Sequence, residues 1–297
     1  AMQSWLRRKL EREKIKMGLL ALSKKYKEEP KNQSILIYGD SGVGKSRTAA
    51  TVALIPWVER VFWLDLDNSM ETLFHMNLPD SAMKKIIPFR MGDTRKEPYV
   101  LNTIQKMYSS TTDLSLCEEH SRMNCLTCGK AKLPFQSFNM TSLTNRDVLV
   151  FDNGSAFFDA IVNFILKGQS DDAILQIQDW GTALNFLKAI LQVVQNGRYG
   201  HTIMTAHTMY IHTFQGKPPN REIVKTAEFP MLGTSTFAPK AGGYFGTVIN
   251  LRIGGGKHTG ISSTLGKPNV QARSRAGVCL EKEGNPDMKY FFPLEVK

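Results

Sequence analysis

Short apolar runs bounded by polar residues recur between residues 34 and 207, and they predict buried β-strands. The runs cover residues 35–38, 61–67, 85–89, 147–152 and 201–207. The stretches between them predict helices, which cover about ten residues from Lys45 and then residues 98–108, 155–166 and 178–195. Because strands alternate with helices, the pattern predicts an α/β fold with a mostly parallel sheet and helices on both faces.

Two regions depart from this alternation. Residues 110–140 are polar and cysteine-bearing, which indicates a small lobe inserted into the core. From residue 208 onward Gly, Pro, aromatic and β-branched residues dominate, and we expect antiparallel hairpins that extend the sheet. Residues 3–29 are rich in Lys and Arg, with apolar residues at helical spacing. We therefore predict a basic helix at residues 1–30, either solvated or an arm that contacts DNA or another subunit, followed by a core at residues 31–297.

The most specific pattern is a glycine-rich loop between a strand and a helix. Gly39 is followed after four residues by Gly44, Lys45 and Ser46, which is the spacing of a P-loop. Glycines let backbone amides approach phosphates, the lysine brings charge to the β- and γ-phosphates, and the serine hydroxyl binds Mg²⁺. We therefore expect ATP and Mg²⁺ as cofactors. Nine residues are predicted to bind the nucleotide: Gly39, Asp40, Ser41, Gly42, Val43, Gly44, Lys45, Ser46 and Arg47.

A carboxylate is needed beside this loop, because Mg²⁺ bound to a nucleotide is oriented by an acidic residue on a neighbouring strand. Asp152 closes an apolar strand and is the candidate Mg²⁺ ligand together with Ser46, the alternative being that Asp152 caps the following helix. Hydrolysis also needs a group that orients water. Asp67 ends the second predicted strand and is our choice, with Glu71 as the alternative.

A cluster of metal-ligating residues lies in the predicted lobe. Cys117, His120, Cys125 and Cys128 supply three thiolates and one imidazole in two short pairs, which is the ligand set of a closed structural Zn²⁺ site. The segment is short of apolar residues, so a metal would replace hydrophobic burial. The alternative is three free surface thiols.

Charge and hydropathy narrow the class of partner. The net charge of +11 and the pI of 9.4 favour a polyanion such as nucleic acid. No apolar run reaches the roughly 20 residues that cross a bilayer, and no secretory signal is recognisable. The chain has only 4 cysteines, and this number does not indicate a fold held together by disulfide bonds. We therefore expect a cytoplasmic protein without a membrane partner.

Several motifs resemble, in order, those of RecA-like ATPases. Asp-Leu-Asp at residues 65–67 resembles the strand end where the family usually has Asp-x-Glu, the Glu acting on water. Residues 150–153 resemble the Walker B strand, in which Ser usually stands in place of Asn153. Thr-Ala-His at residues 205–207 resembles the strand end that reads the γ-phosphate. The resemblance implies catalytic roles for Lys45, Asp67, Asp152 and His207, although a lone histidine can also be structural.

The C-terminal part resembles the tail of phage-encoded RecA-like ATPases, which are linked to single-strand annealing and recombination. The matching residues are 229–233, 244–251 and 270–277. Related oligomeric ATPases carry a Lys-x-Arg pair there that reaches the γ-phosphate held by the next subunit. The resemblance therefore implies self-association into a ring or filament, with Arg273 and Arg275 catalytic across the interface. The alternatives are exposed arginines at a sheet edge or further DNA contacts.

Aromatic and basic residues alternate through residues 208–246, which is typical of surfaces that bind single-stranded DNA, because cations hold phosphates and rings stack on bases. The residues are Tyr210, Phe214, Lys217, Arg221, Lys225, Phe229, Phe237, Lys240 and Tyr244. Ordinary hairpin packing is the alternative for the aromatics.

The motifs together predict a RecA-like ATPase with C-terminal hairpins and a small zinc-binding insertion. It would act on single-stranded DNA in recombination or replication of a phage-like genome, in the cytoplasm of the bacterial host. The main alternative is a nucleotide-gated loader that binds a protein partner and hydrolyses ATP weakly, which the shorter acid at Asp67 favours. A small-molecule kinase fits poorly, because the chain lacks an obvious lid.

Overall fold

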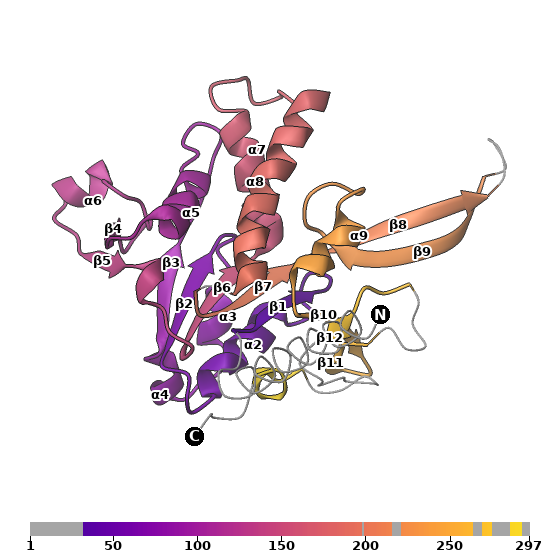
Figure 1. The fold of residues 1–297 in the computed structure, drawn as a ribbon, viewed down its shortest axis with the longest axis horizontal. Coiled ribbons are helices and arrows are strands. Elements are labelled where there is room, and N and C mark those ends of the chain that lie inside the picture. Colours follow the sequence, from indigo (N-terminus) through magenta and orange to yellow (C-terminus); the bar gives the residue numbers. More distant parts are fainter. Residues whose placement is uncertain (1–31, 198, 216–220, 264–268, 275–285, 293–297) are drawn as a thin grey trace, which may run out of the picture. The chain divides into compact units, whose positions relative to one another are not determined.

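A central sheet of eight strands organises the computed structural model (Figure 1). Its order is β11-β10-β1-β7-β6-β2-β3, with β12 paired to β10. The bounds are β1 Ser34–Tyr38, β2 Arg60–Asp65, β3 Ile86–Arg90, β6 Asp147–Asp152, β7 His201–Ala206, β10 Thr247–Gly254, β11 Lys257–Ile261 and β12 Arg273–Ser274. The strands from β10 to β3 run parallel, whereas β11 and β12 are antiparallel to β10.

The structure describes residues 32–292 apart from residues 198, 216–220, 264–268 and 275–285, and these form one compact unit. The basic helix predicted at residues 1–30, together with Arg275 and Lys217, lies outside the described residues. No helix in the described part is both long and apolar enough to cross a membrane.

Helices cover both faces of the sheet, as the alternating pattern predicted. One face packs against α2 Lys45–Ala50, η1 Thr51–Leu54, α3 Glu71–Phe74, α4 Asp80–Met83 and η4 Met288–Tyr290. The other packs against α5 Val100–Ser109, α7 Gly154–Ile165, α8 Ile177–Asn196 and α9 Ala238–Ala241. Two short turns, η2 Met140–Ser142 and η3 Gly242–Tyr244, complete the helical segments. Because both faces are covered, the central strands are apolar almost throughout; every residue of β1 is buried.

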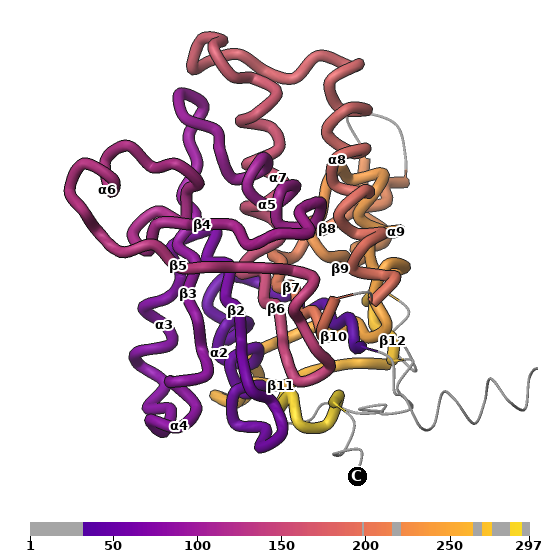
Figure 2. Tube along the Cα trace, turned by 60° about the vertical axis from the view of Figure 1, so that its left-hand side comes forward, coloured from indigo at the N-terminus to yellow at the C-terminus, as the bar shows by residue number. Residues whose placement is uncertain are grey.

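Two hairpins lie outside the sheet. The lobe consists of β4 Leu114–Cys117, α6 Leu126–Lys130 and β5 Phe135–Phe138, and it lies beside β3 (Figure 2). The second hairpin, β8 Thr208–Gln215 and β9 Glu222–Pro230, projects away from the sheet (Figure 1). The prediction that the C-terminal hairpins extend the sheet is right for β10 and β11 and wrong for β8 and β9. The reason is that β8 follows β7, whose two edges are already paired with β1 and β6.

The direction of the strands positions the polar residues. Strands β1, β2, β6 and β7 are parallel, so their carboxyl ends meet at one edge of the sheet. Ligands of open α/β sheets bind at this edge, where loops leave the strands. It carries the P-loop and the residues that follow Asp65, Asp152 and Ala206.

Candidate functional site: a nucleotide pocket at the carboxyl edge of the sheet

The P-loop joins β1 to α2, as its spacing predicted. A Cβ atom at Gly39 would lie 2.6 Å from the carbonyl oxygen of Leu251, so only glycine fits this crossing. Gly44 precedes α2 with φ of 89°, a conformation that favours glycine. The Lys45 side chain is buried, and its Nζ donates to the carbonyl oxygens of Gly39 at 3.1 Å and Asp40 at 2.8 Å. The ammonium group is therefore held inside the curve of the loop.

A pocket of about 260 Å³ separates this loop from the ends of β2, β6 and β7. Its walls are Ser41, Gly42, Gly44, Lys45, Ser46, Asp67, Ser69, Thr72, Asp152, Asn153 and His207. The structure thus brings together the predicted lysine, the predicted Mg²⁺ ligands and two further predicted catalytic residues. Ser69 and Thr72 were missed by sequence reasoning, because isolated hydroxyl residues after a strand carry no distinctive spacing.

Asp152 is held by two hydroxyl groups. Thr205 Oγ1 donates to Asp152 Oδ1 at 2.6 Å, and Ser69 Oγ donates to Asp152 Oδ2 at 2.6 Å. Both oxygens of the carboxylate therefore have a fixed direction before any cation binds. Asp152 does not cap α7, because that position belongs to Asn153, whose Oδ1 accepts from the Ala156 amide at 2.8 Å.

The capping bond also fixes the other half of the Asn153 amide. Since Oδ1 faces the helix, Nδ2 must face the pocket, where it donates to Asp67 Oδ2 and lies 3.5 Å from His207 Nε2. Sequence reasoning noticed Asn153 only as a departure from the usual Ser. In the structure it links Asp67 to the end of β6.

Three carboxylates crowd this edge. Burial raises the pKa of Asp65 to about 6, and the nearby charges of Asp152 and Asp67 add to the effect. Partial desolvation, together with the charge of Asp152, also raises the pKa of Asp67. Such clustered negative charge is stabilised by a divalent cation, which is the environment that Mg²⁺ requires.

His207 lies half-buried between two nitrogen donors. Its Nδ1 is 3.5 Å from Lys45 Nζ, and its Nε2 is 3.5 Å from Asn153 Nδ2. Burial and the charge of Lys45 lower the pKa of the ring, although Asp67 and Asp152 oppose the shift. The imidazole is therefore neutral at pH 7 and carries a single N–H.

Some predicted residues lie outside this pocket. Arg47 is exposed on α2, and Glu71 begins α3 without lining the pocket. Arg273 pairs with Val248 on the far side of β10 and does not line the pocket either. Asp40 and Val43 line a neighbouring hollow instead.

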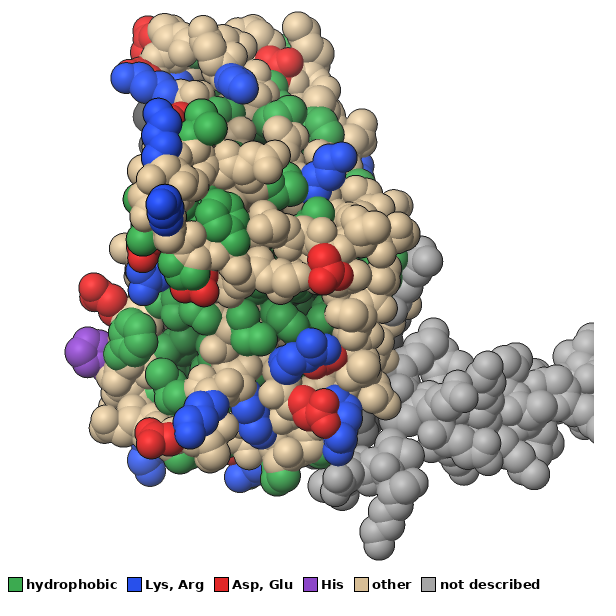
Figure 3. All heavy atoms as spheres, turned by 90° about the vertical axis from the view of Figure 1, so that its left-hand side faces the viewer, with side chains coloured by type: hydrophobic (Ala, Val, Ile, Leu, Met, Phe, Trp, Pro, Cys, Tyr) green, Lys and Arg blue, Asp and Glu red, His purple; other side chains and the backbone are tan. Residues whose placement is uncertain are grey.

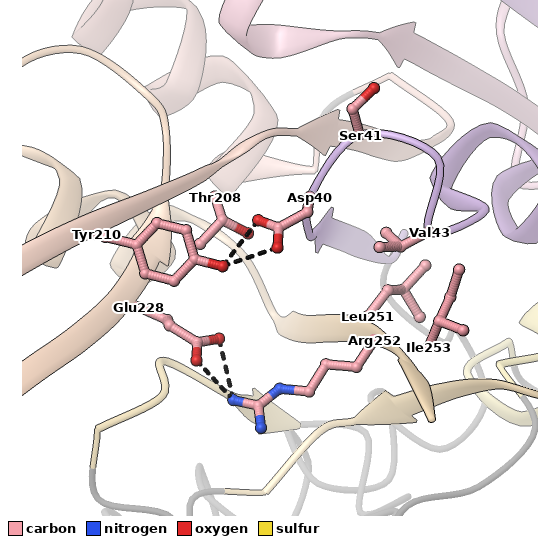
Figure 4. A pocket seen from close by; sticks show the side chains of 9 residues that line it. All are labelled: Asp40, Ser41, Val43, Thr208, Tyr210, Glu228, Leu251, Arg252 and Ile253. Atoms are coloured by element: carbon pink, nitrogen blue, oxygen red, sulfur yellow. Dashed lines mark hydrogen bonds and ion pairs between the residues drawn. The ribbon is translucent and has the colours of Figure 1, made fainter. Parts of the chain in front are cut away.

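That hollow, of about 450 Å³, lies between the P-loop and the β8–β9 hairpin (Figure 4). The Tyr210 hydroxyl contacts both carboxylate oxygens of Asp40, at 2.9 and 2.8 Å. On the opposite wall, Arg252 Nη2 contacts both oxygens of Glu228, at 2.9 and 3.0 Å. Tyr210 of β8 is thus bonded to the P-loop, and Glu228 of β9 is bonded to β10.

Four of the five predicted DNA-stacking aromatics separate into two groups, and the fifth, Phe229, is half-buried on β9. Phe237 is buried in the core with Tyr244 packed beside it, so hairpin packing explains this pair. Tyr210 and Phe214 are exposed on β8, and the Arg221 guanidinium lies 4.1 Å from the centre of the Phe214 ring. Only the second group is accessible to a ligand.

The four predicted zinc ligands come together in the lobe. The ligand atoms of Cys117, His120, Cys125 and Cys128 all lie within 4.8 Å of one another. His120 Nδ1 is 3.3 Å from Cys128 Sγ and 3.7 Å from Cys125 Sγ. The thiols are buried, which excludes the alternative of three surface thiols.

A family model described as an AAA domain matches residues 31–228, which is more than half of the chain. The chain belongs to this AAA domain family. The matched part of the chain includes the P-loop, the three aspartates Asp65, Asp67 and Asp152, and His207. Strands β10 to β12 lie after the matched part. The protein accordingly contains a P-loop AAA domain built on a mostly parallel sheet. Comparison with curated proteins gives no match.

Several solved structures are similar to this chain. An ATPase from the type III secretion system of pathogenic bacteria is 11% identical, with a TM-score of 0.39, over 75% of this chain and 51% of that one. This chain therefore spans about half the length of that protein. The flagellar accessory protein FlaH from Methanocaldococcus jannaschii is 14% identical, with a TM-score of 0.34, over 78% and 77% of the two chains. The RadB recombinase is 10% identical, with a TM-score of 0.36, over 78% and 80%.

Proposed function

We propose that this protein hydrolyses ATP with Mg²⁺ and couples hydrolysis to binding of single-stranded DNA, as a self-associating RecA-like protein of the type that phages encode for recombination or replication. One observation carries the proposal. The β8–β9 hairpin begins at Thr208, directly after His207, which contacts Lys45 in the nucleotide pocket. A change at the γ-phosphate therefore acts on the first residue of the exposed hairpin.

The hydrogen bonding of His207 supports its role as the phosphate sensor. A neutral imidazole has one N–H donor, yet within the described residues both ring nitrogens contact donors, Lys45 Nζ and Asn153 Nδ2. Whichever nitrogen carries the proton, that N–H lacks an acceptor among these neighbours. A γ-phosphate oxygen would supply it, and would also give Lys45 a stronger partner than two loop carbonyls.

The other pocket residues then have distinct roles. Ser46 and Asp152 would hold Mg²⁺, which supplies charge neutralisation on the phosphates. Asp67 would orient the attacking water, in preference to Glu71, because only Asp67 lines the pocket. The amide of Asn153 keeps the Asp67 carboxylate in place.

The hairpin is the proposed DNA surface. Phe214 offers an exposed ring for stacking, while Arg221 and the exposed Lys225 offer charge to phosphates.

Arg273 and Arg275 are proposed to reach the pocket of a neighbouring subunit, in a ring or filament. We propose that the protein has three parts: a basic helix at residues 1–30, a core at residues 31–297 and, within the core, the lobe at residues 110–140. Its proposed location is the bacterial cytoplasm. Zn²⁺ is proposed for the lobe, none of whose four ligands lines the nucleotide pocket.

A loader that binds a protein partner is the second candidate, and a specific observation favours it. Ile223 and Val224 of β9 are each 54% exposed, which is a surface suited to a protein rather than to phosphates.

Steady-state ATPase activity with and without single-stranded DNA distinguishes the two functions. We expect DNA to stimulate turnover, and we expect the Phe214→Ala/Arg221→Ala double variant to lose the stimulation while keeping basal turnover. The matched control is Ile223→Ser/Val224→Ser on the same hairpin, which should keep DNA stimulation. Absence of stimulation in the wild-type protein would favour the loader.

A further inference from the structure

We propose that Zn²⁺ bound by Cys117, His120, Cys125 and Cys128 folds the lobe into a cap that closes the free β3 edge of the central sheet. This inference rests on the zinc site within the proposed function, and it is independent of ATP and DNA. The bound metal would thereby protect a strand edge against pairing with other chains.

The edge needs protection. β3 is the last strand of the sheet and pairs only with β2 among the described strands. A free edge strand presents unpaired backbone groups and is a template for association with another chain. Figure 3 looks onto this side of the unit and shows hydrophobic side chains gathered in a hollow across it. Such a surface would make an open edge more adhesive.

The lobe contacts this edge directly. Gln136 of β5 donates from Nε2 to the carbonyl oxygen of Pro88 in the middle of β3, at 2.9 Å. Phe138 of β5 packs edge-on against Phe62 of β2 at 5.3 Å and Phe89 of β3 at 5.5 Å between ring centres. One polar and two aromatic contacts thus fix β5 beside β3.

A second attachment involves the backbone of a metal ligand. The Tyr99 hydroxyl, at the start of α5, donates to the carbonyl oxygen of His120 at 2.7 Å. Arg122, two residues further on, stacks on the Tyr99 ring at 4.0 Å and contacts Glu97 at 2.7 Å. The loop that carries the ligands is therefore held to the core between β3 and α5, and its conformation decides whether the cap is seated.

The ligand-bearing part of the lobe, residues 117–134, has little hydrophobic burial of its own. Its own interior cluster consists of the three cysteines alone. Leu116 and Phe138 are buried against the core rather than within the lobe. The remaining large apolar side chains of β5 and the ligand-bearing loop are largely open to solvent; Leu126 is 78% exposed, Leu133 39% and Phe135 38%. Helix α6 has 5 residues, fewer than a helix needs for stability in water. A bound metal would supply the folding free energy that this part lacks.

The geometry suits zinc. Three sulfur atoms and one imidazole nitrogen within 4.8 Å of one another match a tetrahedral site, in which the preference for thiolate selects Zn²⁺ over Mg²⁺ or Ca²⁺. The Arg122 amide donates to Cys117 Sγ at 3.5 Å, which is the kind of bond that stabilises a metal-bound thiolate.

The test combines metal analysis with a measure of the cap. The full-length protein is analysed for zinc, then stripped with a zinc-selective chelator in excess Mg²⁺, and finally given Zn²⁺ again. We expect one zinc per chain, faster proteolysis within residues 110–140 after stripping by roughly tenfold or more, and growth of high-molecular-weight species by light scattering. Both changes should reverse on return of Zn²⁺.

Variants separate the metal from the thiols. Cys125→Ser/Cys128→Ser should copy the stripped protein without chelator, whereas Cys279→Ser, outside the described residues, should keep zinc and an intact cap. Native protein without zinc would overturn the site. Zinc release that leaves the cleavage pattern and the scattering unchanged would overturn the cap, even if ATP hydrolysis and DNA binding behave as proposed.

Discussion

The parallel strands of the central sheet begin at one edge, the amino edge, and end at the other, the carboxyl edge. Both edges carry the same kinds of residue, but the hydrogen bonding of these residues differs. Strand β6 begins with Asp147 and ends with Asp152, and β7 begins with His201 and is followed by His207. At the amino edge these side chains complete their hydrogen bonds within the protein. At the carboxyl edge Asp152 is bonded on both oxygens, but His207 and the neighbouring Asp65 lack partners that they need within the described part of the chain. That difference, rather than residue type, marks the ligand site.

The amino edge is a closed network. Arg60 donates to both oxygens of Asp147, at 2.7 and 2.8 Å, and Thr144 adds a backbone bond at 2.7 Å. Burial alone would raise the pKa of Asp147, but these bonds outweigh it and hold the pKa below its usual value. His201 Nδ1 accepts from the Gln33 amide at 2.9 Å, and Nε2 donates to the carbonyl oxygen of Asn145 at 2.8 Å. Each ring nitrogen thus has the partner that it needs.

The carboxyl edge is incomplete. Asp65 Oδ2 is buried and has no hydrogen-bond partner among the described residues, and the pKa of this carboxyl is raised to about 6. His207 faces two donors, Lys45 Nζ and Asn153 Nδ2. Unpaired groups of this kind are costly in a folded protein unless a ligand completes them.

The largest effect should come from the cation at the centre of the carboxyl edge. Lys45→Ala removes the charge that the phosphates need, so we expect ATP turnover to fall by roughly a thousandfold or more. The thermal midpoint should change little without nucleotide, because the short hydrogen bonds of Lys45 go to two carbonyl oxygens of its own loop, and its contact with His207 is longer, at 3.5 Å. Turnover and the thermal midpoint are measured on the same preparation, and near-normal hydrolysis would refute the nucleotide site.

The same substitution at the two ends of β6 tests the comparison directly. Asp152→Asn should lower turnover by about a hundredfold, because a neutral amide holds Mg²⁺ poorly. Asp147→Asn should keep turnover at low temperature yet cost about 2 kcal/mol of unfolding free energy, since it breaks a pair that is buried on the aspartate side. Denaturant titration and ATPase assays of both variants give the answer. Equal losses of activity would mean that the two edges do not differ in role.

Much of the fold followed from the sequence. The strands β1, β2, β3, β6 and β7 lie within a residue or two of their predicted positions, because buried parallel strands are continuous apolar runs between turn signals. The ten residues from Lys45 are helical as predicted, although η1 completes the last turn as a 3₁₀ helix. The position of β8 and β9 outside the sheet was not predictable, because the occupied edges of β7 are a property of strands far away in sequence.

The site was predictable where spacing carries chemistry. The P-loop residues Ser41, Gly42, Gly44, Lys45 and Ser46 line the pocket, and Asp67, Asp152 and His207 join them because parallel strands end at one edge. The roles of Ser69 and Asn153 depend on side-chain directions that no pattern encodes. The bond between Tyr210 and Asp40 likewise depends on how the hairpin lies over the P-loop.

A smaller effect should separate the two acids that follow β2. Asp67→Asn keeps a side chain of the same size beside Asn153 but loses the charge that orients water, so we expect turnover to fall by roughly tenfold to a hundredfold with nucleotide affinity preserved. Glu71→Gln is the matched control and should keep normal turnover, because Glu71 does not line the pocket. The opposite pattern would transfer the role to Glu71.

The smallest effect concerns the two histidines of β7. Burial lowers the pKa of His201 to about 4, below the 6.5 of an unfolded chain. Below pH 6.5 the unfolded state therefore takes up a proton that the folded state refuses, so stability is full above that pH and falls as the pH decreases toward 4. Between pH 7 and pH 5.5 the expected loss of unfolding free energy from this group is about 1 kcal/mol.

His201→Gln is the control, because a glutamine amide can accept from Gln33 and donate to Asn145 without titrating. Denaturant titrations at both pH values should show that the unfolding free energy of this variant depends less on pH than that of the wild-type protein. His207→Gln, the same change at the other edge, should lower turnover. An identical pH dependence in the His201→Gln variant and the wild type would show that the amino edge does not hold this ring in its neutral form.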